Sequence, residues 1–397
     1  MATVHYYSEI VTDTMEDLEN IQPYNDEEAV AALQKLARHP AMPVISKYIF
    51  PEFPVSTLKN LLLNIKGVDD FQYSIVSKAV SVVLGRSSSG FTYEGVENLR
   101  NVAGSGKFLA VSNHRDIVLD PALTQWMLML NNVPLTEICV GSNLLSNSVV
   151  EALLRSNRMI TVIRGISARE VYLSSQILSK FIRSEVVSGK SSVWIAQREG
   201  RTKNGLDITE QGLLKMFDMS GTADFKTNFQ ELNIIPMSIS YEYEPCDFRK
   251  AREILIKQIT GEYHKKEDED MRSILTGIRQ WKGGIHLHVG KPLSEAEITR
   301  SSWYEKNDRY QAIRRILDER IISGYKLWKT NYMGYDLMTG GSKYADMYTE
   351  EDLKKFKEYT EHKLSRAERK LDKNELRNIF WHIYGNPVLA KEGPEKE

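Results

Sequence analysis

Residues 108–121 read FLAVSNHRDIVLDP, which is an apolar run followed by a polar turn and then by the expected start of a helix. Residues 108–112 predict a buried β-strand, and Pro121 suits the first turn of a helix. In α/β proteins, ligands bind where the carboxyl end of a strand meets the N-terminus of a helix. The turn contains one histidine, one arginine and two aspartates: His114, Arg115, Asp116 and Asp120. It is therefore the first candidate for a functional site.

His114 has the surroundings that a general base requires. A carboxylate that accepts a hydrogen bond from one ring nitrogen fixes the tautomer and raises the basicity of the other. Asp116 and Asp120 are both close enough in sequence to supply that carboxylate. A capped helix with a solvated histidine is the structural alternative.

The triplet His114-Arg115-Asp116 also occurs in the catalytic loop of protein kinases. A kinase needs an asparagine five residues after the aspartate, and that position is Pro121 here. The sequence also lacks the glycine-rich phosphate loop and the Asp-Phe-Gly motif of kinases. The kinase class is therefore excluded.

Short β-rich runs alternate with helical stretches on both sides of this segment. The predicted strands are 108–112, 159–163, 192–196, 234–240 and 285–289, and the predicted helices are 121–131, 146–156, 168–187, 209–219 and 248–261. Such alternation predicts an α/β domain with a mixed, largely parallel central sheet flanked by helices. We place this domain at residues 87–295.

The flanking regions, 1–86 and 296–397, are expected to be helical N- and C-terminal extensions. Asn25 and the acids after it predict a helix that begins there and ends before Pro40. A capping signal at Asp372 predicts a break in the last helical stretch. The apolar stripes of 58–84 and 353–384 could either pack on the catalytic domain or lie in a membrane interface.

The composition sets further limits. A net charge of −1 gives no overall attraction to nucleic acid or to an anionic membrane. The first 20 residues are acidic without an apolar core, so we expect no signal peptide, and no run of about 18 uncharged apolar residues is present. Cys139 and Cys246 are read as buried small hydrophobes in a reducing compartment. His286 and His288 share a strand face, but no third ligand stands out, so no metal is expected.

Six ordered blocks within residues 91–293 resemble the glycerolipid acyltransferase family, whose active-site motif is a histidine and an aspartate with four residues between them. The turn at His114 is similar to the block SNHRS-x-LDP, and Glu199–Gly205 is similar to the block EGxRSRxG. The remaining blocks are YEGVENL at 93–99, GSNLL at 141–145 with Leu154-Arg155 and Ile163-Arg164, IPMSISYE at 235–242, and HVGKPL at 288–293.

Two departures from the family pattern affect the site residues. Five residues rather than four separate His114 from Asp120, and the block at 199–205 is one residue short between Gly200 and Arg201. Asp116 could therefore replace Asp120 as the partner of His114. We favour Asp120, because Leu119-Asp120-Pro121 fits the end of the block and a bulge at 116–118 can absorb the extra residue.

The resemblance implies transfer of a fatty-acyl group from acyl-CoA or acyl carrier protein to the hydroxyl of glycerol-3-phosphate in phospholipid biosynthesis. His114 would act as the general base without a covalent acyl-enzyme, since no G-x-S-x-G elbow is present. The acceptor's phosphate calls for guanidinium groups, so Arg201 is the first choice. The other candidates for substrate binding are Lys203, Arg115, Arg155, Arg164, Glu199, Gly200 and Thr202.

No cofactor is expected beyond the acyl carrier as co-substrate. Without a spanning segment, we expect a cytoplasmic protein that is peripheral on the inner face of the membrane. Two alternatives stay open. The acceptor could be 1-acyl-glycerol-3-phosphate, or the chain could be an acyl-lipid-binding or membrane-tethering protein whose catalysis has lapsed.

Overall fold

The computed structural model describes residues 21–393 except 104–105, 146–147 and 165–166. The expectations for the first 20 residues and for the last four lie outside the described residues. Within them, no helix is both long enough and apolar enough to cross a membrane.

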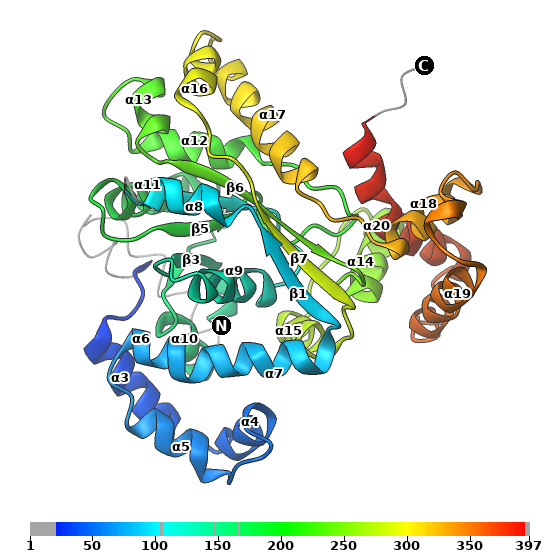
Figure 1. The fold of residues 1–397 in the computed structure, drawn as a ribbon, viewed down its shortest axis with the longest axis horizontal. Coiled ribbons are helices and arrows are strands. Elements are labelled where there is room, and N and C mark those ends of the chain that lie inside the picture. Colours follow the sequence, from blue (N-terminus) through cyan, green and yellow to red (C-terminus); the bar gives the residue numbers. More distant parts are fainter. Residues whose placement is uncertain (1–20, 104–105, 146–147, 165–166, 394–397) are drawn as a thin grey trace.

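A seven-stranded sheet runs through the middle of the molecule in the order β1-β7-β6-β2-β5-β3-β4 (Figure 1). β6 and β7 pair antiparallel, and the other neighbours pair parallel. The strands are β1 (Gly90–Glu94), β2 (Leu109–Ser112), β3 (Glu137–Gly141), β4 (Met159–Val162), β5 (Val193–Ala196), β6 (Ile234–Tyr241) and β7 (Gly284–Val289). The predicted fold class, a largely parallel sheet with helices around it, is confirmed.

All five strands predicted from the sequence are present within one residue of their expected ends. The prediction missed β3 and did not delimit β1. β1 is an edge strand whose burial alternates, and β3 is only half-buried at its end. Neither strand therefore shows the continuous apolar run that identified the buried strands in the centre of the sheet.

Helices cover both faces of the sheet. One face packs on α11 (Ala168–Val187), α12 (Gln211–Met219), α13 (Phe225–Gln230), α16 (Glu295–Ser302) and α17 (Asp308–Ser323), and the other on α8 (Val96–Ala103) and α9 (Leu119–Leu130). Side chains alternate along a strand, so Leu109 and Val111 enter the first core, while Ala110 enters the second.

The N-terminal helices form a separate apolar core beneath the sheet. They are α3 (Asp26–Leu36), α4 (Met42–Ile49), α5 (Ser56–Leu63), α6 (Val68–Phe71), the π-helix at Gln72–Val76 and α7 (Ser77–Ser87). Asn25 caps α3 as predicted, with its side chain accepting from the Glu28 amide. Leu58 and Leu62 are buried in this core. The apolar stripe of α5 therefore packs inside the protein and does not face a membrane.

The C-terminal helices α18 (Lys329–Thr339), α19 (Glu350–Leu364) and α20 (Lys373–Glu392) pack with α14 (Asp247–Thr260) around a fourth core (Figure 1). Asp372 caps α20 at the predicted break. Phe356 and Phe380 are buried here, so this stripe also packs within the protein. α17 ends at Ser323, and Tyr325 after it turns inward, where its hydroxyl donates to Asp207 at 2.5 Å.

Short connecting segments, among them the 3₁₀ turn Ala345–Met347 between α18 and α19, join these parts, and three more lie within the sheet domain. They are the 3₁₀ turn Ser142–Leu144, α10 (Ser148–Arg155) and α15 (Glu269–Arg279). The last two residues of the charged run 264–270 form the first turn of α15. Asp270 accepts a hydrogen bond from Asn143 at 2.7 Å, so α15 begins beside the block at 141–145.

Candidate active site

His114 follows β2 directly, and Asp120 lies in the first turn of α9. The His114 Nδ1 and Asp120 Oδ2 atoms are 2.8 Å apart. An ionised carboxylate only accepts hydrogen bonds, so Nδ1 carries the proton and Nε2 presents a lone pair. No described residue hydrogen-bonds to Nε2, which is the arrangement that a general base requires.

Asp120 is held by more than the histidine. Its Oδ2 atom also accepts the backbone amides of Arg115 at 2.5 Å and Asp116 at 2.9 Å. Its Oδ1 atom accepts the hydroxyl of Tyr241 at 2.7 Å. Burial and the nearby charges of Asp120 and Asp116 raise the pKa of Tyr241 well above its usual value, so this hydroxyl stays a donor. The carboxylate therefore cannot rotate away from the imidazole without breaking several hydrogen bonds.

Asp116, the other candidate partner, points elsewhere. Its Oδ1 atom accepts the amides of Val118 and Leu119 at 3.0 and 2.9 Å, which closes the turn before α9. Its Oδ2 atom is buried without a partner against α15, where a Cβ on Gly277 would lie 2.0 Å from it. The residue added between His114 and Asp120 is thus accommodated in a turn that Asp116 caps, and the carboxylate beside the imidazole is that of Asp120.

Two aromatic residues at this site were missed by the sequence reading. Trp194 on β5 meets the His114 ring edge-on, with the centroids 6.0 Å apart, and Tyr241 supports Asp120. Tyr241 is the last residue but one of the block at 235–242, so its place within a family block was a signal that could have been used. Trp194 looks like any core residue of a strand and gives no signal of its own.

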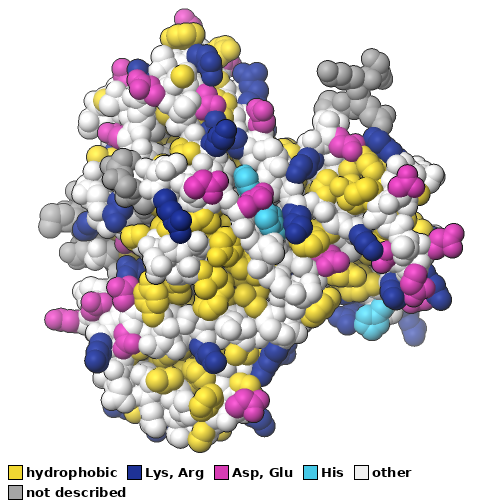
Figure 2. Space-filling model, viewed as in Figure 1, with side chains coloured by type: hydrophobic (Ala, Val, Ile, Leu, Met, Phe, Trp, Pro, Cys, Tyr) yellow, Lys and Arg dark blue, Asp and Glu magenta, His cyan; other side chains and the backbone are white. Residues whose placement is uncertain are grey.

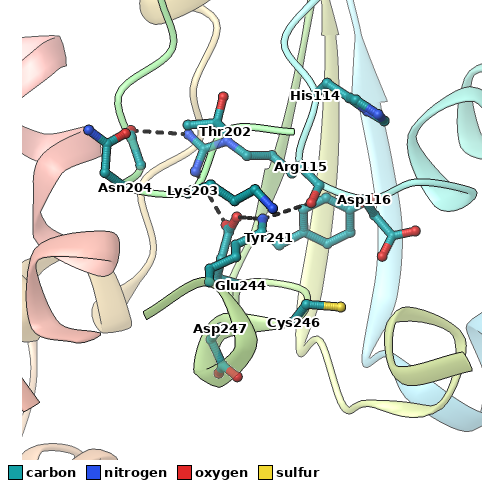
Figure 3. Close-up of polar contacts among 12 residues, drawn as sticks. His114, Arg115, Asp116, Thr202, Lys203, Asn204, Tyr241, Glu244, Cys246 and Asp247 are labelled. Atoms are coloured by element: carbon teal, nitrogen blue, oxygen red, sulfur yellow. Dashed lines mark hydrogen bonds and ion pairs between the residues drawn. The ribbon is translucent and has the colours of Figure 1, made fainter. Parts of the chain in front are cut away.

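Arg115, predicted as a phosphate ligand, is instead a buried structural residue. Its Nη2 and Nε atoms donate to Asp207 at 2.7 and 3.1 Å, and its Nη1 atom donates to Glu244 at 3.3 Å. Lys250 extends the network, since its Nζ atom donates to Glu244 at 2.5 Å and to the Arg115 carbonyl at 2.7 Å. Figure 3 shows Arg115 and Glu244 of this network beside Tyr241. The guanidinium is already neutralised by two carboxylates, so no group is left for a phosphate.

Thr202 is also a structural residue rather than a substrate ligand. It is fully buried, and its hydroxyl donates to Asp207. Its backbone amide donates to the carbonyl of His114 at 2.8 Å. Burial raises the pKa of Asp207, but Arg115 and the hydrogen bonds outweigh it and hold that pKa below its usual value. This anchored carboxylate ties the loop at 199–205 to the histidine turn, and Arg201 directly precedes Thr202 in that loop.

Arg201 differs from Arg115, Arg155 and Arg164 because no described carboxylate lies within ion-pair distance of it, and the acid that its charge influences, Asp270, is already paired with Lys265. It is 7% exposed, and its Nη1 atom is buried without a hydrogen bond. Lys203 lies nearby, with its Nζ atom 2.6 Å from Glu253. Burial and the charge of Arg201 lower the pKa of Lys203 to about 8, although Glu253 opposes them. A buried guanidinium without a carboxylate at ion-pair distance is costly, so Arg201, with Lys203 nearby, is suited to receive an anion.

The remaining predicted residues divide into two groups. Arg155 serves the fold, because its Nη2 atom donates to the Gln22 carbonyl at 3.0 Å and its guanidinium lies 4.4 Å from the Tyr24 ring centroid. It ties α10 to the chain before α3, and its prediction as a substrate ligand is not supported. Arg164 and Glu199 pair with each other at 3.3 Å, after the carboxyl ends of β4 and β5. These two therefore stay at the edge of the sheet that carries His114.

Gly200 lies in the loop before Arg201, and His286 and His288 lie on β7. Gly200 has a φ of 69°, and a Cβ there would meet nothing within 4 Å, so the glycine serves the turn and leaves space beside Arg201. His286 and His288 approach Glu94 Oε1 at 3.4 and 2.9 Å. Within the described chain, no group of three or more His, Cys, Asp or Glu residues could hold a metal ion.

No curated protein matches the chain. Residues 90–240 match the family model described as Acyltransferase. This match covers the histidine turn, the block at 199–205 and most of the block at 235–242. The family resemblance read from the sequence blocks is thus confirmed, and residues 90–240 of this chain form an acyltransferase domain of the PlsC-type glycerolipid acyltransferase family.

Proposed function

We propose that the protein transfers a fatty-acyl group from acyl-CoA or acyl carrier protein to the hydroxyl of glycerol-3-phosphate. His114 Nε2 takes the proton of the attacking hydroxyl, and Asp120 stabilises the imidazolium that forms. The tetrahedral intermediate then expels the carrier thiolate, which regains the proton from His114. Direct attack by the acceptor accounts for the transfer without a covalent acyl-enzyme.

The unpaired guanidinium of Arg201 carries the assignment of a phosphorylated acceptor. It lies in the loop whose Thr202 amide binds the His114 carbonyl, so an anion bound there places its hydroxyl near the imidazole. Lys203 adds a second charge. A small acceptor such as glycerol-3-phosphate fits this proposal, and 1-acyl-glycerol-3-phosphate shares the same phosphate and is the second candidate.

The decisive experiment supplies the purified protein with acyl-CoA or acyl carrier protein and a panel of acceptors. Glycerol-3-phosphate should be acylated fastest, 1-acyl-glycerol-3-phosphate more slowly, and unphosphorylated glycerol hardly at all. Transfer to glycerol at the rate of glycerol-3-phosphate would remove the phosphate from the proposal. Binding of acyl donors without transfer to any acceptor would favour the lapsed, lipid-binding alternative.

Variants of Arg201 test the acceptor site separately. Arg201→Ala should reduce kcat/KM for the acceptor about ten- to a hundredfold, because a charge-assisted hydrogen bond contributes roughly 1.5–3 kcal/mol. Arg201→Lys should be almost as damaging, since an ammonium cannot bind a phosphate through two parallel bonds. Steady-state kinetics with each substrate varied in turn decides the matter. A rise in the donor's KM alone would assign Arg201 to the carrier instead.

A peripheral position on a membrane is part of the same proposal. Within the described chain, the most exposed apolar side chains near the N-terminus lie on and between α4 and α5. Val44 is 75% exposed, Phe53 is 55% exposed and Val55 is 46% exposed. Apolar side chains also gather over α9 on the face drawn in Figure 2. These side chains would enter the interface, with Lys47 and Lys59 close by in sequence to meet anionic lipid.

A further inference from the structure

A cavity of about 580 Å³ lies behind the candidate active site, between α14, α15 and the end of α19. Its size is within the range of small-molecule and cofactor sites. Every residue that lines it follows residue 240, so the cavity is built outside the segment that matches the acyltransferase family. None of the residues assigned above to the acyl-transfer chemistry lines it.

The acidic side chains of the cavity wall are already engaged. Arg252 pairs with Glu368 at 2.5 Å, Arg272 with Asp268 at 2.5 Å, and Lys363 with Asp247 at 3.3 Å. Two further acids also have partners, since Glu262 lies 2.7 Å from His264, and Glu269 accepts the Tyr263 hydroxyl at 2.7 Å.

Three cations of the wall, in contrast, have no acidic partner among the described residues. Arg249 donates from Nε to the neutral Thr276 hydroxyl at 3.2 Å, and Arg366 meets only the ring of His362, at 3.3 Å. Lys266 forms no ion pair within the described chain. Arginine and lysine side chains without acids are the groups that bind phosphate, and Phe248 and Tyr263 in the same wall give flat apolar surface for a base.

α15 separates this cavity from the catalytic turn and contacts both. Arg272 and Thr276 line the cavity, whereas Gly277 packs against the Asp116 carboxylate. At the floor of the cavity, the Cys246 thiol donates to the Ser273 carbonyl of α15 at 3.3 Å. In Figure 3 this thiol points to the same side as the Asp116 carboxylate. The cavity wall and the catalytic turn therefore share α15 as a common neighbour.

We infer that this cavity binds the adenosine bisphosphate portion of coenzyme A, which is the acyl donor. The inference rests on the proposed function and selects acyl-CoA as the donor, because acyl-CoA is the proposed substrate that carries nucleotide phosphates. The unpaired Arg249, Lys266 and Arg366 bind the phosphates, and Phe248 and Tyr263 contact the adenine. The donor is then held by helices beyond residue 240, while the acceptor is held by Arg201 within the family-matched segment.

Titration calorimetry on the full chain tests binding without any catalysis. Adenosine 3′,5′-bisphosphate should bind the unmodified protein, and Arg249→Gln and Arg366→Gln should each weaken it roughly tenfold or more. Lys257→Gln and Arg369→Gln are the matched controls, and both should leave binding unchanged. Lys257 lies on α14 like Arg249, Arg369 lies in the connection after α19 like Arg366, and both are exposed cations outside the cavity wall. Absence of binding, equal binding by Arg249→Gln, or equally tight binding of inorganic phosphate alone would overturn the inference.

Kinetics then separate this inference from the proposed function. Arg249→Gln should raise the KM for acyl-CoA roughly tenfold, with kcat and the acceptor's KM unchanged. If the unmodified protein transfers acyl groups but Arg249→Gln alters only the acceptor's KM, the cavity is not the donor site, and the function stands. If only acyl carrier protein serves as donor, the inference also fails. If no transfer occurs but the bisphosphate binds as described, the proposed function fails and the nucleotide site stands.

Discussion

At the scale of single residues, the structure separates two carboxylates that the sequence left as rivals. Asp120 faces the imidazole of His114 and is fixed by Tyr241, whereas Asp116 caps the turn and faces α15. A residue that orients a general base affects turnover, whereas one that closes a turn affects mainly stability. The two roles therefore predict different kinetic results.

Replacing each aspartate by asparagine tests this division. Asp120→Asn should lower kcat strongly, approaching the 10²–10⁴-fold loss expected for His114→Ala, because the amide cannot stabilise the imidazolium. Asp116→Asn should have a small effect, because its amide oxygen can still accept from Val118 and Leu119. Turnover numbers of the three variants, with circular dichroism as the fold control, provide the measurement. The opposite ranking of the two asparagine variants would move the functional carboxylate to position 116.

The depressed pKa of Lys203 predicts how acceptor binding depends on pH. A lysine whose pKa is lowered to about 8 is charged below that pH and loses its charge above it. If the charge helps to hold the phosphate, the acceptor's KM should rise up to tenfold per pH unit above about pH 8. The phosphate itself does not titrate in that range, since its second pKa is about 6. Lys203→Arg should flatten the profile, and a flat profile in the unmodified protein would exclude Lys203 from the acceptor site.

At the scale of elements, the C-terminal helix α20 supports the loop that carries Arg201. Asn386 donates to the Asn204 carbonyl at 2.7 Å. Gly205 has a φ of 81°, and a Cβ on it would lie 2.4 Å from the Ile383 carbonyl. The close approach that this glycine allows is therefore to the protein's own helix. The loop is held between β2, through Thr202, and α20.

Gly205→Ala should consequently disturb both stability and acceptor binding. The left-handed backbone costs an alanine about 1–2 kcal/mol, and the clash with Ile383 adds to this. Gly189→Ala is a matched control, because its φ of 76° is similar but a Cβ there meets nothing within 4 Å. Urea unfolding should show the larger loss for Gly205→Ala, and only this variant should raise the acceptor's KM. Equal behaviour of the two variants would mean that α20 does not position the loop.

At the scale of the whole molecule, the exposed apolar side chains are spread unevenly. Val44 and Phe53 belong to the N-terminal helices beneath the sheet, whereas Trp303, 75% exposed, follows α16 at the opposite end of the molecule (Figure 1). The helical stripes that the sequence offered as membrane-binding surfaces are buried in two internal cores. The proposed membrane-facing surface is therefore the exposed one at Val44 and Phe53, not either of these buried stripes.

Co-sedimentation with anionic vesicles tests this surface. The protein should bind at low salt and dissociate as salt rises, because each basic residue near an anionic surface contributes about 1 kcal/mol. Phe53→Ser should weaken binding severalfold, and Trp303→Ser, an equally drastic loss of exposed aromatic surface at the other end, should not. Loss of binding in Trp303→Ser alone would place the contact surface elsewhere, and no binding at low salt would reject membrane contact.

The sequence by itself determined the features that depend on neighbouring residues along the chain. Buried strands such as β2 and β6 follow from continuous apolar runs, and the starts of α3 and α20 follow from the caps Asn25 and Asp372. The histidine turn could be recognised for the same reason, because its residues are contiguous. A half-buried strand such as β3 carries too little of that local signal to be found.

Only the tertiary structure decided which charged side chains are available to a ligand. Arg115 and Arg201 look equally suitable in sequence, but Arg115 is neutralised by Asp207 and Glu244, roughly 90 and 130 residues further along the chain. Arg201, in contrast, has no described carboxylate within ion-pair distance, and its Nη1 atom is buried without a hydrogen bond. The choice between Asp116 and Asp120 likewise depended on Tyr241 and Gly277. The free energy of a buried charge is set by the groups that surround it in space, and folding brings those groups together from distant parts of the chain.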